Sequence, residues 1–159
     1  MDRESALKKV IHFCEYQERS KQEVAERLNE WGVDESLIPS LIEQLEANNY
    51  IHEGRFAREY AHGKFKIKGW GKIRIRQGLL RKGIPENLIV EGLKSIDEEE
   101  YISKVQSLIQ KKMEMEEEKE KEEEMPLNDY QKNHKVAKYI LSHGFEPDLV
   151  WKFLKHEEI

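Results

Sequence analysis

The chain has 159 residues and a formal net charge of −5, and it is 38% hydrophobic and 37% charged. This composition is lean in apolar residues and favours thin helical units with much exposed surface. No apolar run approaches the roughly 18 residues of a membrane span, and residues 1–4 do not open a secretory signal. Cys14 is the single cysteine, which excludes an internal disulfide framework and a multi-thiolate metal site. We therefore expect a cytoplasmic protein in which Cys14 is a small core residue.

Three helices are predicted in the first 50 residues. Apolar residues at helical spacing predict a helix over residues 6–16. Ser20 and Glu23 have the spacing of a capping box, which marks the start of a second helix. Gly32 follows this helix as a C-terminal cap with positive φ. Asp34 is then the expected N-cap of a third helix.

The same arrangement occurs three times. Gly32, Gly83 and Gly144 each follow a predicted helix and precede an apolar residue. Around these glycines, six columns of matching residues align in all three copies, with spacings of 51 and 61 residues between the glycines. Such repetition predicts an all-α fold of three tandem three-helix repeats, forming an elongated, curved array. The expected repeats are residues 1–51, 52–97 and 98–159.

The third copy carries an insertion. Asp97 is its expected N-cap, and helices resume near Asn128. Between them, residues 114–124 contain eight Glu, two Lys and one Met. This segment is either a helical extension in solvent or a mobile linker, and with no apolar stripe we expect nothing to pack it down. It serves as a solvated spacer or, alternatively, folds back on the basic residues as an intramolecular mimic of a polyanion.

Positive charge is concentrated between Arg55 and Lys82. This stretch holds ten Lys/Arg and one acid, a charge of +9, so the remainder of the −5 chain carries −14. Such asymmetry points to a polyanion or an acidic partner surface. Phe65 and Trp70 lie within the stretch and either pack between helices or stack on bases.

Arg76 departs from the repeat pattern, because the aligned positions in the other copies hold Ala25 and Ala137. In one interpretation its stem packs while the guanidinium reaches water at the helix edge. In the other, the middle copy opens a cationic groove between its first two helices. An ion pair from Arg76 to a neighbouring helix would rule out the groove at this position.

Two segments of the basic stretch resemble the bacterial RecX family, which comprises regulators of the recombinase RecA. They are RFAREY (residues 55–60) and GWGKIRIRQGLLRKGI (residues 69–84). The resemblance covers nearly the whole chain, since that family is also built of three tandem three-helix repeats. The chain departs from the family at His52-Glu53-Gly54, where an acid often precedes the arginine, and in its longer glutamate-rich insert.

The resemblance implies a non-enzymatic regulator that acts in recombination, DNA repair and the SOS response. Such proteins bind in the helical groove of the RecA filament on single-stranded DNA and suppress strand exchange, ATP hydrolysis and coprotease activity. We expect a monomer that needs no cofactor or metal and binds no membrane, and a contact with single- or double-stranded DNA stays open. The partner-binding residues expected by position are Arg55, Arg58, Lys64, Lys66, Lys68, Trp70, Lys72, Arg74, Arg76 and Arg81.

Other functions compete with this one. A three-helix unit can act as a helix-turn-helix module, so the alternative is a nucleic-acid-binding module that acts on DNA directly. Tight, salt-dependent binding to free single-stranded DNA would favour that alternative. A third interpretation is a scaffold whose basic stretch is merely solvated. Catalysis is not expected, because the six histidines are scattered and no metal-ligand or nucleophile motif is evident.

Overall fold

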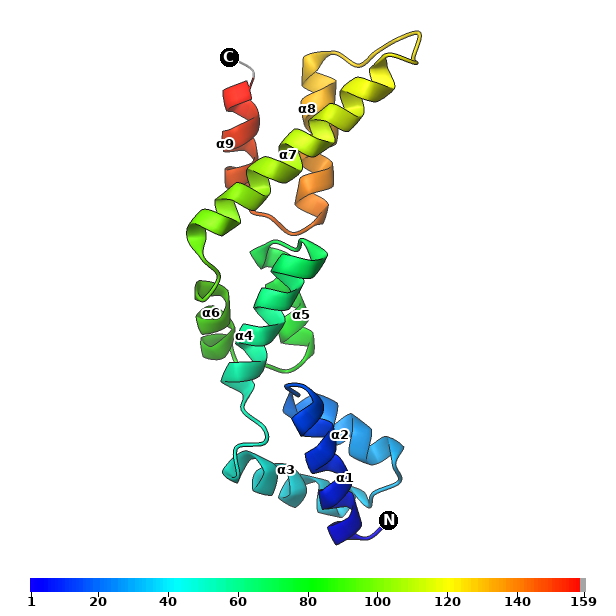
Figure 1. Ribbon diagram of the computed structural model, residues 1–159, viewed down its shortest axis with the longest axis vertical. Coiled ribbons are helices and arrows are strands. Elements are labelled where there is room, and N and C mark those ends of the chain that lie inside the picture. Colours follow the sequence, from blue (N-terminus) through cyan, green and yellow to red (C-terminus); the bar gives the residue numbers. More distant parts are fainter. Residues whose placement is uncertain (158–159) are drawn as a thin grey trace. The chain divides into compact units, whose positions relative to one another are not determined.

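The computed structural model describes residues 1–157, with side chains through residue 154. These residues form helices and no β-strand, which confirms the all-α prediction. None of the described helices is both long and apolar enough to cross a membrane. In Figure 1 the α-helices are α1 (Arg3–Tyr16), α2 (Lys21–Glu30), α3 (Ile38–Ala47), α4 (Glu53–Gly63), α5 (Lys72–Arg81), α6 (Glu86–Lys94), α7 (Glu98–Glu120), α8 (Asp129–Ser142) and α9 (Pro147–Glu157).

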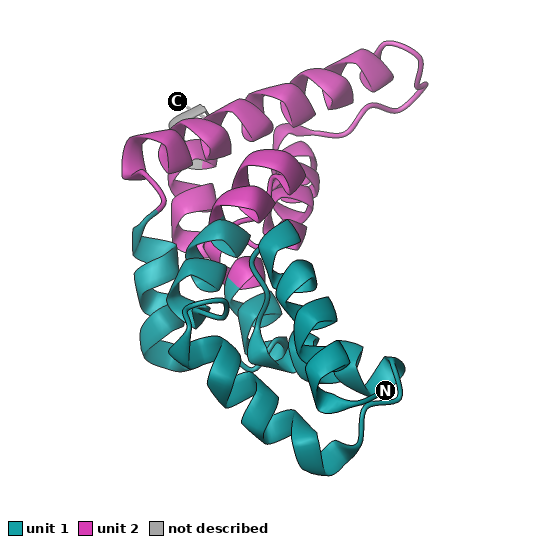
Figure 2. Ribbon diagram, turned by 60° about the horizontal axis from the view of Figure 1, so that its bottom comes forward, with its two compact units in different colours: residues 1–61, 76–95 teal, residues 62–75, 96–159 magenta. Residues whose placement is uncertain are grey.

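The chain divides into two compact units, which Figure 2 shows in different colours. Unit 1 comprises residues 1–61 and 76–95, and unit 2 comprises residues 62–75 and 96–159. The division falls inside α4 and α5, so both units draw on the central part of the chain. The repeat boundaries expected after residues 51 and 97 stay a prediction.

The three aligned glycines have the backbone conformation that the repeat pattern predicts. Gly32, Gly83 and Gly144 have φ values of +79°, +76° and +92°. This left-handed region strains residues that carry a Cβ, so each glycine lets the chain turn directly after a helix. The apolar residues that follow them, Val33, Ile84 and Phe145, are all buried.

The predicted helix starts are mostly confirmed. The capping box of α2 is present, with Glu23 N–H donating to Ser20 Oγ (3.1 Å) and Ser20 N–H donating to the Glu23 carboxylate (3.0 Å). Asp97 caps α7 by accepting from Glu100 N–H at 3.0 Å. Asp34 accepts from the N–H two residues later, and a short 3-10 helix, η1 (Glu35–Leu37), precedes α3.

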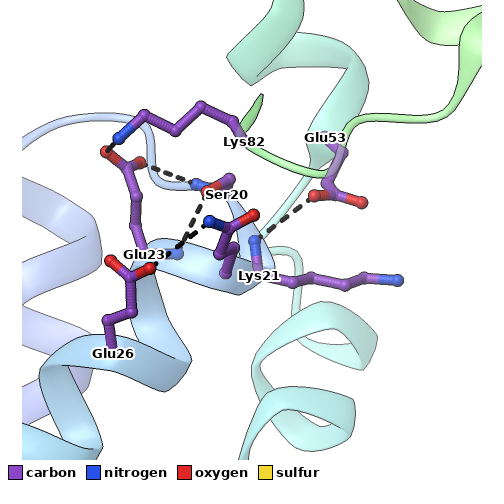
Figure 3. A network of polar contacts seen from close by, with 7 residues as sticks. Ser20, Lys21, Glu23, Glu26, Glu53 and Lys82 are labelled. Carbon is purple, nitrogen blue, oxygen red and sulfur yellow. Dashed lines mark hydrogen bonds and ion pairs between the residues drawn. The ribbon is translucent and has the colours of Figure 1, made fainter. Parts of the chain in front are cut away.

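Unit 1 has a core of apolar side chains from α1, α2 and α3. Cys14 belongs to this core, and burial raises the pKa of its thiol to about 11, so the prediction of a core cysteine is confirmed. Figure 3 shows the polar contacts around the start of α2. There Lys21 N–H donates to Glu53 at 3.3 Å, and Lys82 pairs with Glu23 at 3.2 Å. The first turn of α2 therefore contacts both the start of α4 and the end of α5.

In unit 2 the turn between α8 and α9 lies directly on the start of α5. Gly71 N–H donates to the carbonyl of His143 at 2.7 Å, and Ile73 N–H donates to that of Gly144 at 3.0 Å. A Cβ at Gly71 would come within 2.4 Å of the Gly144 backbone, and one at Gly144 within 2.3 Å of Arg74 Cβ. Only glycines permit this approach, which holds the start of α5 in place.

The glutamate-rich segment is helical through Glu120, because α7 continues to that residue. The prediction that nothing packs this segment is wrong. Glu116 is buried, and its carboxylate pairs with Lys135 of α8 at 2.9 Å and with Lys112 at 3.2 Å. Lys132 of α8 pairs with Glu120 at 3.0 Å. Ion pairs therefore replace the missing apolar stripe, and these two carboxylates are engaged by lysines of α7 and α8.

We predict that Gly71→Ala destabilises the protein by about 1–3 kcal/mol, because the added methyl group overpacks the contact with Gly144. Gly63→Ala is the matched control, since a Cβ there meets no atom within 4 Å. It should change stability by less than about 1 kcal/mol, in the stabilising direction. Urea unfolding followed by circular dichroism measures both effects. Equal stability of the two variants would contradict the close approach.

We predict that Glu116→Gln lowers the melting temperature at neutral pH. The lysines around Glu116 hold the pKa of its carboxyl below the usual 4.5, against the effect of burial. A depressed pKa stabilises the fold above the unfolded-state pKa, and this stabilisation is lost as pH falls through the folded-state value. The difference between wild type and variant should therefore shrink at acid pH. Glu117→Gln, at an exposed position of α7, should show no comparable difference at any pH.

Candidate functional site

The residues expected to bind a partner are divided between the two units, and each group is described by itself. Unit 1 holds the four arginines Arg55, Arg58, Arg76 and Arg81. Unit 2 holds Lys64, Lys66, Lys68, Trp70, Lys72 and Arg74.

The start of α4 explains the residues that precede the RFAREY segment. Arg55 N–H donates to His52 Nδ1 at 3.0 Å, so the imidazole caps the helix in place of a carboxylate. A Cβ at Gly54 would lie 2.9 Å from the His52 ring. Gly54 therefore makes room for the capping histidine. Sequence reasoning missed this cap, because His is seldom expected at an N-cap.

Arg55 is held inside unit 1. Its Nε donates to Glu18 at 2.7 Å, and its terminal nitrogens donate to the side chain and the carbonyl of Asn49 at 3.1 and 2.8 Å. These bonds connect the start of α4 to the segments after α1 and α3. The guanidinium thus makes three hydrogen bonds within the protein, which give it a structural role in this arrangement.

The apolar residues of RFAREY also pack within unit 1. Phe56 and Ala57 are buried. A Cβ at Gly92 would lie 3.0 Å from the Ala57 carbonyl oxygen, and one at Gly78 would lie 2.0 Å from the Tyr60 hydroxyl. Because neither glycine carries a Cβ, the RFAREY segment can pack closely against both of them. Of its two arginines, only the exposed Arg58 projects into solvent without an ion-pair partner among the described residues.

Arg76 forms an ion pair with Glu86 of the neighbouring helix α6. Both terminal nitrogens donate to the carboxylate, with Nη2 to Oε2 at 2.6 Å, and the hydrogen bond to Glu86 raises the pKa of Arg76. The hypothesis of a cationic groove at Arg76 is therefore wrong. Its side chain remains 41% exposed, which agrees with a packed stem and a head at the helix edge. Arg81 is exposed, with no carboxylate of residues 1–154 in ion-pair range.

In unit 2, α4 runs directly into a π-helical segment, η2 (Lys64–Lys68), that ends at Gly69 with φ +69°. Phe65 is buried in this segment and its ring lies 5.6 Å from that of Tyr101. Stacking of Phe65 on bases is therefore excluded. Lys66 and Lys68 are exposed, and neither has an ion-pair partner in the described part of the chain.

The remaining cations of this group lie against aromatic rings. Lys64 Nζ and the Arg74 guanidinium lie 4.8 and 4.3 Å from the centre of the Trp70 ring. Lys72 Nζ lies 4.6 Å from the centre of the Tyr101 ring. A cation–π contact orients a cation but does not neutralise it. The contacts also place two cations beside the Trp70 ring.

Tyr101 holds the backbone at the start of α5. Its hydroxyl donates to Glu146 and accepts from Lys72 N–H at 3.0 Å. Burial, followed by the hydrogen bond with Glu146, raises the pKa of Tyr101, so the hydroxyl stays protonated. The start of α5 is thus anchored by Tyr101 as well as by the Gly144 turn. No sequence motif indicated this hydrogen bond.

The fold and the exposed cations define a helical-repeat protein with a basic central stretch. Family models match two parts of it: residues 6–45 match the first three-helix domain of RecX, and residues 53–93 match the second. Together they cover about half of the chain. The chain belongs to the RecX family, which confirms the resemblance noted from the sequence.

Individual relatives agree with this assignment. The chain is similar to the regulatory protein RecX of Clostridium botulinum, with 29% identity over 96% of this chain and 66% of that protein. It is 31% identical to the RecX of Oceanobacillus iheyensis, over 66% of this chain and 39% of that protein. The chain thus spans two thirds or less of these relatives. The crystal structure of RecX from Lactobacillus salivarius shares the fold, with a TM-score of 0.81 at 20% identity over 96% of this chain and 94% of that one.

The contacts of the two RFAREY arginines lead to a test. Arg55→Ala should destabilise the protein by about 1–3 kcal/mol, because it removes charge-assisted hydrogen bonds and leaves Glu18 without its partner. Arg58→Ala removes the same charge from an exposed position of the same helix and should change stability by less than about 0.5 kcal/mol. Chemical denaturation compares them. A stable Arg55→Ala variant would show that this arginine has no structural role.

Proposed function

We propose that this chain regulates RecA by binding the RecA filament on single-stranded DNA, and that it mostly inhibits strand exchange, ATP hydrolysis and coprotease activity. Membership of the RecX family supports a regulatory role. The finer statement, that the filament is the target, rests on the resemblance and on the charge of the central stretch.

The observation that carries the proposal is the state of the central cations. Arg58 and Arg81 in unit 1, and Lys66, Lys68 and Arg74 in unit 2, form no ion pair with a carboxylate of the described chain. A chain of net charge −5 nevertheless keeps these cations unneutralised. A nucleoprotein filament presents phosphates and acidic side chains to such groups.

Linked weak contacts suit this partner. The cations are distributed over both units, so each unit can make its own contact with the filament. Each contact alone is weak, and linkage through one chain raises the effective concentration for the next. We therefore expect affinity to depend on several cations together, with none of them indispensable.

The alternative function, direct action on DNA as a binding module, shares these cations. The part of it that uses aromatic rings as base-stacking platforms is the less well supported part. Phe65 is buried, and the ring of Trp70 lies against Lys64 and Arg74. The distinction therefore lies in whether RecA must be present on the strand.

The test is a RecA ATPase assay on single-stranded DNA with this protein added. We expect the wild type to inhibit the ATPase. The triple variant Arg58→Glu, Lys68→Glu, Arg74→Glu should lose most of this inhibition. Arg55 and Arg76 are left unchanged, because both form ion pairs within unit 1. Their replacement would change the stability of the protein as well as its binding. The control reverses the exposed Lys8 of α1 and should inhibit like the wild type. Equal inhibition by the triple variant would remove the basis of the proposal.

A further inference from the structure

Unit 2 contains an open pocket of about 380 Å³ formed by η2 and α7. No part of the sequence pattern indicated it, since its two walls are far apart along the chain. The residues that line it are Phe65, Lys66, Glu100, Ser103, Lys104 and Ser107.

The polar side chains of this pocket are not engaged by the protein. Lys66 and Lys104 form no ion pair with a carboxylate of residues 1–154. Ser103 and Ser107 are one helical turn apart on α7, and within the same residues their hydroxyls form no hydrogen bond. Two ammonium groups and two hydroxyl groups therefore line one small space as available hydrogen-bond donors.

Packing holds this wall in position. Phe65 forms an apolar floor, because its ring is buried against Tyr101 at 5.6 Å. The stem of Lys104 reaches the end of η2, where its Cε would lie 3.7 Å from a Cβ at Gly69. The left-handed Gly69 thus ends η2 beside Lys104, so that a cation from each wall faces the pocket.

The charge of the lining selects among anions. Lys66 and Lys104 contribute +2 and Glu100 contributes −1, so the lining carries a formal charge of +1. A phosphodiester carries one negative charge and neutralises this lining, whereas a phosphate monoester carries nearly two. Lysines bind phosphate as point charges, and serine hydroxyls donate to its oxygens.

We propose that this pocket binds a phosphodiester group of a single nucleic-acid strand. Ile67, next to Lys66 in η2, is 82% exposed, and its apolar side chain contacts the sugar or base beside the bound phosphate. Lys68 follows it and adds a further exposed cation. The inference deepens the proposed function and rests on it for the identity of the strand, the single-stranded DNA within the filament.

The test measures binding of labelled oligo-dT to the full chain by fluorescence anisotropy over a salt series, without RecA. For a single strand, a plot of log K against log salt has a slope of about −0.7 for each phosphate contact. Removal of one contact therefore lowers the magnitude of the slope by about 0.7. The double variant Lys66→Ala, Lys104→Ala should lower this magnitude by about 0.7. The control Lys8→Ala, Lys94→Ala removes the same charge from exposed positions of unit 1 and should leave the slope unchanged.

Two further variants separate the neutral contacts from the charges. Ser103→Ala, Ser107→Ala should weaken binding about two- to tenfold at an unchanged slope. Ile67→Ser should also weaken binding at an unchanged slope. Inorganic phosphate, compared with chloride at equal ionic strength, should displace the strand no better. Stronger displacement by phosphate would show a site for the free anion and overturn the assignment to a strand.

The pocket and the proposed function can be tested separately. If the slope of the lysine double variant equals that of its control, the pocket does not bind a phosphodiester, whether or not the protein inhibits RecA. If the slope falls as expected while the wild type leaves the RecA ATPase unchanged, the pocket stands and the filament proposal fails. Circular dichroism confirms that each variant is folded.

Discussion

The cations at the start of α5, Lys72 and Arg74, lie against aromatic rings, and neither forms an ion pair with a carboxylate of residues 1–154. Arg74 lies on Trp70 and Lys72 on Tyr101. A carboxylate in the same place would orient these side chains equally well but would cancel their charge. An aromatic ring restricts the side chain and leaves the full positive charge for a partner. The proposed interaction with an anionic filament depends on these cations having aromatic neighbours.

The position of these cations depends in turn on the glycine turns. The turn at Gly144 packs on the first turn of α5, and a Cβ at Gly83 would lie 3.1 Å from the Gln22 side chain in the first turn of α2. In both units, a turn that closes one helix thus packs on the start of another. Tyr101 adds a hydrogen bond at the same place in unit 2. Lys72 and Arg74 therefore extend from a stretch of backbone that is held by both the Gly144 turn and Tyr101.

Local features were predictable from the sequence because their causes lie within a few residues. The left-handed glycines, the capping box at Ser20 and the cap at Asp97 follow from backbone sterics and unpaired N–H groups at helix ends. Burial of Cys14 follows from helical periodicity. The π-helical turn η2 was not predicted, since periodicity does not distinguish it over five residues.

The long-range ion pairs were not predictable in the same way. The partner of Arg55 is 37 residues away and that of Arg76 is 10 residues away, so neither pair follows from local spacing. Both arginines were expected in the interface because of their charge alone. The buried Glu116 shows the same limit, because its partner Lys135 comes from another helix. In a chain this rich in charge, the folded structure decides which cations form ion pairs within the protein itself.

The most direct measurement of the central claim compares binding to RecA-coated and to naked single-stranded DNA at equal salt. We predict a clear preference for the coated strand, and loss of that preference when Arg58, Lys68 and Arg74 are reversed in charge. Equal affinity for both forms of DNA, or a preference that survives those reversals, would contradict it.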